Sequence, residues 1–159
     1  MNPTPQNAFI QAVEKAFIQA AIDALHSLPA ASLEEQGSIR NTAANPAGDA
    51  TAIIHFAGAR DGYFSIGFSR SFARRHFGDI PGNPEEEVNE RLDDEIGRFS
   101  SRIAAGAQDF LEAQGYAIFP TSVTVIYGKE QELPRSKGGP PLLVSYKSAE
   151  GDVFLEVDF

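Results

Sequence analysis

The first regular pattern of apolar positions lies between Ala8 and Leu28. Apolar residues recur there at spacings of three and four, which predicts a helix with one apolar face. Further isoleucines flank that face, so we expect burial on more than one side. Pro29 should end the helix, because proline cannot continue the backbone hydrogen bonds. The residues of the face are Phe9, Val13, Ala16, Phe17, Ala20, Ala24 and Leu28.

The period then changes to that of β-strands. Residues 50–57 are mostly apolar, and in residues 64–69 large apolar side chains alternate with serine and glycine. Asp61-Gly62 between them is a turn signal, so these segments predict an antiparallel hairpin whose second strand is half-buried. Residues 29–48 are rich in turn formers and predict a loop with one short strand near Ile39. A short helix is expected from Arg70 to Phe77.

A second long helix is predicted from Pro84 to Gln114. Asn83 can cap it, Pro84 suits its first position, and Glu86 completes a capping box. Its apolar stripe continues at spacings of four and three, through Val88, Leu92, Ile96, Phe99, Ile103, Gly106 and Phe110. This register places Phe99 and Ile103 in the core and exposes Arg98 and Arg102. Gly97 and Gly106 each cost about 1 kcal/mol against alanine, so we expect another element to pack closely against them.

The C-terminal third alternates between apolar and polar residues and predicts strands. These lie at residues 122–127, 142–148 and 153–159, with Glu156 and Asp158 opposite the apolar face of the last one. Residues 130–141 hold three prolines and two glycines and predict a surface loop. The order of elements predicts one α+β domain over residues 1–159. Two long helices should pack on one face of a largely antiparallel sheet.

Composition narrows the function. The chain has 159 residues and a net charge of −9, and an acidic surface repels the phosphates of nucleic acid. It has no cysteine, no apolar segment long enough to span a membrane and no signal-peptide pattern at its start. We therefore expect a soluble cytoplasmic protein. The three histidines, His26, His55 and His76, have no second ligand at metal spacing, so no metal or cofactor is predicted.

Several segments, in order, resemble the CheX and CheC family of chemotaxis phosphatases. They include Asn7 to Val13, the hairpin after Ala52, Gly115 to Thr121 and Phe154 to Phe159, together with Leu92 to Gly97 and Ile103 to Gly106 in the second long helix. The resemblance implies a partner, the receiver domain of a CheY-type response regulator. It also implies a homodimer that pairs through sheet edges.

The family removes the receiver's phosphoryl group with a Glu and an Asn, three positions apart on the exposed side of the long helix. The Asn orients the attacking water and the Glu holds a lysine of the receiver. In this sequence Arg98 and Ser101 occupy those positions, so no catalytic residue carries over. Asp94, Arg98, Ser101 and Arg102 remain candidate binding residues. The alternative interpretation is that these residues form an ordinary solvent-exposed helix face with ion pairs such as that between Asp94 and Arg98.

Three functions stay open at this point. The first is a receiver-binding module whose phosphatase activity is lost or much reduced. The second is a working phosphatase with altered side chains, and the third is a structural subunit related to the flagellar switch proteins. Glu86 and Asn89 repeat the spacing of the family pair, but they lie 12 residues too early and Glu86 already serves the capping box.

Overall fold

The computed structural model describes residues 5–28, 33–41, 43, 45–81, 90–133, 135 and 139–159. The predicted capping residues Asn83, Pro84 and Glu86, the Glu86–Asn89 pair and Pro29 lie outside these ranges. In chain order the elements are α1 (Pro5–His26), β1 (Glu34–Arg40), β2 (Ala50–Gly58), β3 (Gly62–Phe68), α2 (Arg70–His76), α3 (Glu90–Ala113), β4 (Ile118–Tyr127), β5 (Leu142–Ser148) and β6 (Gly151–Asp158). The predicted hairpin, short helix and C-terminal strands are confirmed. The strand near Ile39 extends over seven residues.

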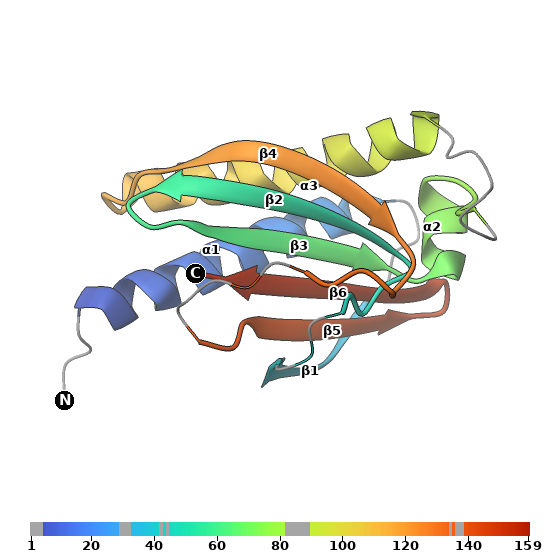
Figure 1. Cartoon of the computed structure of the whole chain (residues 1–159), viewed down its shortest axis with the longest axis horizontal. Coiled ribbons are helices and arrows are strands. Elements are labelled where there is room, and N and C mark those ends of the chain that lie inside the picture. Colours follow the sequence, from blue (N-terminus) through green and yellow to red (C-terminus); the bar gives the residue numbers. More distant parts are fainter. Residues whose placement is uncertain are drawn as a thin grey trace.

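The strands form one sheet in the order β1-β5-β6-β3-β2-β4, and every neighbouring pair is antiparallel. Helices α1 and α3 pack against each other and lie behind the sheet in Figure 1, while α2 sits at one end of it. The α+β architecture and the placement of both long helices on one face are therefore confirmed. Strands β1 and β4 form the two edges of this sheet.

The core lies between the helices and the sheet. In α1, Phe17 is fully buried, with its ring 4.8 Å from Phe64 and 5.2 Å from Phe56. In α3 the buried stripe runs from Leu92 through Ile103, as predicted, but then continues through Ala107 and Leu111. The buried stripe steps by four from Ile103 to Ala107 and Leu111, and Phe110, about 100° around the helix from Leu111, is 39% exposed.

The opposite face of the sheet, here called the outer face, is covered over its central strands β2 and β3. Six of the seven residues of β3 are buried, so the prediction of a half-buried strand is wrong. The segment after β4 crosses this face, and Leu133 packs there against Ile53 and Tyr63. The prediction that residues 130–141 form a surface loop is therefore wrong at Leu133 and at Arg135, whose side chain is 24% exposed.

A polar network joins that segment to the sheet. The carboxylate of Glu156 accepts hydrogen bonds from Tyr63 Oη at 2.6 Å, from Asn41 Nδ2 at 3.0 Å and from Arg135. Arg135 also donates to the backbone carbonyl of Ala43. Burial, together with the Glu156 carboxylate, raises the pKa of Tyr63 well above its ordinary value, so its hydroxyl remains a donor.

Candidate functional site

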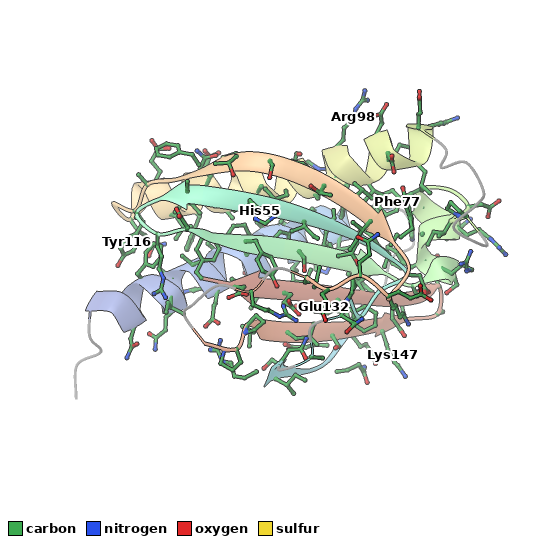
Figure 2. All side chains as sticks on the ribbon, viewed as in Figure 1. His55, Phe77, Arg98, Tyr116, Glu132 and Lys147 are labelled. Carbon is green, nitrogen blue, oxygen red and sulfur yellow. The ribbon has the colours of Figure 1, made fainter. Side chains whose placement is uncertain are left out.

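The four candidate binding residues come together in one groove. Asp94, Arg98, Ser101 and Arg102 are all exposed on the same side of α3, and they line a groove of about 700 Å³ between that helix and β4. Helical spacing explains the grouping, since residues three and four apart share a face. Figure 2 shows Arg98 projecting away from the sheet. The predicted exposure of Arg98 and Arg102 is therefore confirmed.

Packing on the opposite side of α3 holds this register. Phe99 is 4% exposed and Ile103 is 1% exposed, as predicted. Ser100 is also buried, and its hydroxyl donates to the Gly97 carbonyl at 2.9 Å, which satisfies it within the helix. Rotating α3 to hide Arg98 would expose these side chains. The groove residues are thus fixed in direction by the core beneath them.

The charged groups of the groove are not paired with one another. Within the described ranges, neither Arg98 nor Arg102 has a carboxylate oxygen within 4.0 Å. The expected pair from Asp94 to Arg98 is therefore not formed, and the i,i+4 ion pair of this helix joins Arg91 to Glu95 at 3.1 Å. The guanidinium of Arg102 lies 5.4 Å from the ring centroid of Phe99, a cation–π contact that leaves its N–H donors available.

A hydrogen bond between α3 and β4 closes the acidic end of the groove. Tyr127 donates its hydroxyl to Asp93 Oδ1. Burial and the Asp93 carboxylate raise the pKa of Tyr127, so the phenol stays protonated. Asp93 is thereby engaged within the protein, whereas Asp94 faces solvent. The two residues are 34 positions apart, and no local sequence signal connects them.

The apolar wall and the floor of the groove were not identified from the sequence. Val123, which is 45% exposed, and Val125 line it from β4. Gly97 lines it from α3, and a Cβ added there would meet nothing within 4 Å. The expectation that another element packs closely against Gly97 is therefore wrong. The same expectation holds for Gly106, where a Cβ would lie 3.4 Å from Ala20 Cβ of α1.

The histidines form no comparable site. The described residues contain no group of three or more His, Asp or Glu side chains that could hold a metal ion. His76 is almost buried and lies 2.5 Å from Glu150 Oε2, which joins α2 to the turn between β5 and β6. That contact gives His76 a structural role. No helix in the described part of the chain is long and apolar enough to cross a membrane.

Comparison with known proteins identifies the fold. No protein-family model and no curated protein sequence matches this chain. Among solved structures, CheX from Vibrio vulnificus superposes with a TM-score of 0.76 at 21% identity, over 92% of this chain and 97% of that one. CheX in its complex with CheY, BeF3 and magnesium from Borrelia burgdorferi gives 0.72 at 20% identity, over 91% and 95%. FliY from Thermotoga maritima gives 0.55 at 13% identity, over 99% and 92%. The chain has the CheX/CheC-type fold.

Proposed function

Starting from a CheX/CheC-type fold, we propose that this chain binds the receiver domain of a CheY-type response regulator through the groove between α3 and β4. Residues 1–159 would act as one domain, in the cytoplasm, with little or no phosphatase activity. One observation carries the proposal: Asp94, Arg98, Ser101 and Arg102 line one exposed groove on the helix that carries the catalytic pair in the family. The CheX–CheY complex among the structural neighbours supports the choice of partner.

The loss of activity follows from side-chain chemistry at the two family positions. Ser101 has a hydroxyl that can donate and accept, but it reaches less far than an asparagine amide and leaves the attacking water unheld. A misplacement of about 1 Å can cost on the order of a hundredfold in rate. Arg98 replaces a carboxylate with a permanent positive charge, which repels a receiver lysine rather than binding it. Both changes weaken the family reaction.

The test uses a receiver domain encoded near this chain's gene. Titration with its beryllofluoride-activated form should show binding that weakens with salt. Dephosphorylation of the phosphorylated receiver should be no faster than in the no-protein control, and the double variant Arg98→Glu with Ser101→Asn should exceed that control. Strong activity of the natural chain, abolished by a substitution outside the groove, would show that the assignment of the lost pair is wrong. Failure to bind any receiver of the same genome would reject the partner.

Two alternatives have weaker support. A working phosphatase needs a group that positions water, and Asp94 is the exposed carboxylate of the groove; loss of receiver dephosphorylation in Asp94→Asn would support that alternative. The likeness to FliY supports a structural subunit related to the flagellar switch, but the TM-score with FliY, 0.55, is lower than that with CheX, 0.76. Such a subunit would sediment in a large assembly when isolated from cells.

We also propose a homodimer, formed through β4. This strand is an edge of the sheet, ten residues long and without a charged side chain. Phe119 is 54% exposed and Val123 45% exposed on it. Pro120 and the irregular pairing beside it disfavour pairing at one end of this edge, and the rest of the edge, from Thr121 to Tyr127, has no such protection and can pair with another strand. The opposite edge, β1, is shorter and carries Glu34, Glu35 and Arg40, which disfavour pairing. A monomer at all micromolar concentrations in sedimentation would reject the dimer.

A further inference from the structure

Arg98 and Arg102 differ from most arginines of this chain. Within the described residues, five of the other seven lie within 4.0 Å of a carboxylate oxygen, at Arg40, Arg74, Arg75, Arg91 and Arg135. Carboxylates are abundant, since the chain has 22 acidic and 13 basic residues. Even so, within the described ranges the two groove arginines have no carboxylate partner. Two adjacent unpaired guanidinium groups on an acidic protein favour binding of an anion from outside.

The groove also has the geometry for a compact oxyanion. Arg98 and Arg102 are four positions apart on α3, with Ser101 between them in sequence, and all three line the groove, so guanidinium N–H groups and a hydroxyl are available to one bound anion. Gly97 offers no side chain that would block approach to this part of the groove. The acidic residues lie one turn earlier, where Asp93 is held by Tyr127. An anion would therefore be bound at the Arg98–Arg102 end.

Resting on the function proposed above, we propose that this groove binds the phosphoryl group of the receiver and protects it from hydrolysis. Guanidinium forks match phosphoryl oxygens, and where no group positions an attacking water, binding the ground state in this way need not accelerate the reaction. Val123 and Val125 would cover the bound group on its β4 side. Among the described residues the groove has no histidine, and its exposed carboxylate, Asp94, lies one helical turn before Arg98. The chain then prolongs the phosphorylated state of the receiver, which the CheX family shortens.

The experiment follows the lifetime of the phosphorylated receiver. The receiver is phosphorylated with acetyl phosphate, freed of donor and incubated with saturating chain. We expect its half-life at least to about double, since in-line water is denied to the bound group. Affinity should be higher for the beryllofluoride-activated receiver than for the unactivated one. Arg98→Gln and Arg102→Gln should each weaken binding of the activated form about tenfold or more. Arg74→Gln, an exposed arginine on α2, is the matched control and should bind as the natural chain does.

The outcomes separate this inference from the function on which it rests. Binding of the activated receiver with an unchanged half-life, or equal affinity for both forms, overturns protection and leaves receiver binding in place. A shortened half-life overturns protection and supports the working phosphatase. Absence of binding overturns both proposals. Unchanged binding in Arg98→Gln and Arg102→Gln, with circular dichroism showing intact folding, overturns the assignment of the anion site.

Discussion

The ion pair between Arg135 and Glu156 holds the segment after β4 onto the outer face of the sheet. The Glu156 side chain is 5% exposed and that of Arg135 is 24% exposed. Replacing Arg135 by methionine keeps an aliphatic stem over the sheet but removes the charge. Glu156 is then a buried carboxylate with two neutral donors, Tyr63 and Asn41. We expect Arg135→Met to destabilise the protein strongly, because an uncompensated buried charge remains.

The magnitude follows from the burial of the pair. Breaking a buried ion pair costs about 3–5 kcal/mol, and the two hydrogen bonds that Glu156 keeps place the expected cost near the lower end, about 3 kcal/mol. For a protein of this size that corresponds to a fall in Tm of roughly 6–12 °C. The matched control is Arg74→Met. Arg74 Nε lies 2.8 Å from Asp79 Oδ1, but the two side chains of this pair are 68% and 78% exposed. The control substitution should lower the free energy of unfolding by at most about 1 kcal/mol.

Urea unfolding, followed by circular dichroism, measures both variants. Adding Glu156→Gln to Arg135→Met should recover part of the loss, because the neutral amide removes the stranded charge. The Cm of the single variant should therefore lie below that of the double variant. Equal destabilisation by Arg135→Met and Arg74→Met would refute the reasoning. It would mean that solvent reaches Glu156 and that the segment after β4 does not shield the outer face.

Three further predictions concern other parts of the fold. Burial and the Glu35 carboxylate raise the pKa of Tyr146 to about 12, and its buried hydroxyl has no hydrogen-bond partner among the described residues. Tyr146→Phe should therefore raise the free energy of unfolding by about 1 kcal/mol at pH 8. Between pH 10 and 12 the phenol ionises first in the unfolded protein, which lowers the stability of the natural chain, and the variant should lose less. Urea titrations across this pH range test both expectations. Gly151 has φ +133°, and a Cβ added there would lie 2.4 Å from Ser69 Oγ, whereas at Gly115, with φ +89°, an added Cβ would meet nothing within 4 Å. Gly151→Ala should therefore lower Tm more than Gly115→Ala, which adds backbone strain alone. Thr124→Lys, on the edge strand β4 and outside the groove, should dissociate the proposed homodimer in sedimentation, and an unchanged dimer would exclude this edge.

The elements of this fold were predictable because each has a strong local period. Helix α3 repeats apolar residues at three and four, and β6 alternates, so type and facing direction follow from the sequence. The covering of the outer face was not predictable. Arg135 meets Tyr63 across 72 positions, and Asn41 meets Glu156 across 115. A strand carrying Glu156 opposite an apolar face looks solvated until a distant segment is known to cover it.

The groove was predictable on its helical side and not on its strand side. The register of α3 placed Arg98, Ser101 and Arg102 on one exposed face because the core residues between them fixed its orientation. Val123 and Val125 come from β4, and the sequence does not reveal that this strand lies beside α3. The open site at Gly97 was also missed, because a helical glycine usually signals close packing and here it leaves space instead.

The side of α3 that carries the groove can change its chemistry at little cost to the fold. Arg98 and Ser101 are exposed and make no contact on which the core depends, so substitutions there should change stability by no more than about 0.5 kcal/mol. In Arg98→Glu the new carboxylate would lie four positions after Asp94, which is unfavourable, and four before Arg102, which is favourable, by similar amounts. The double variant with Ser101→Asn should therefore unfold within about 2 °C of the natural chain. A larger fall in Tm would mean that these positions support the fold, and any change in receiver dephosphorylation could then not be ascribed to the side chains of the groove.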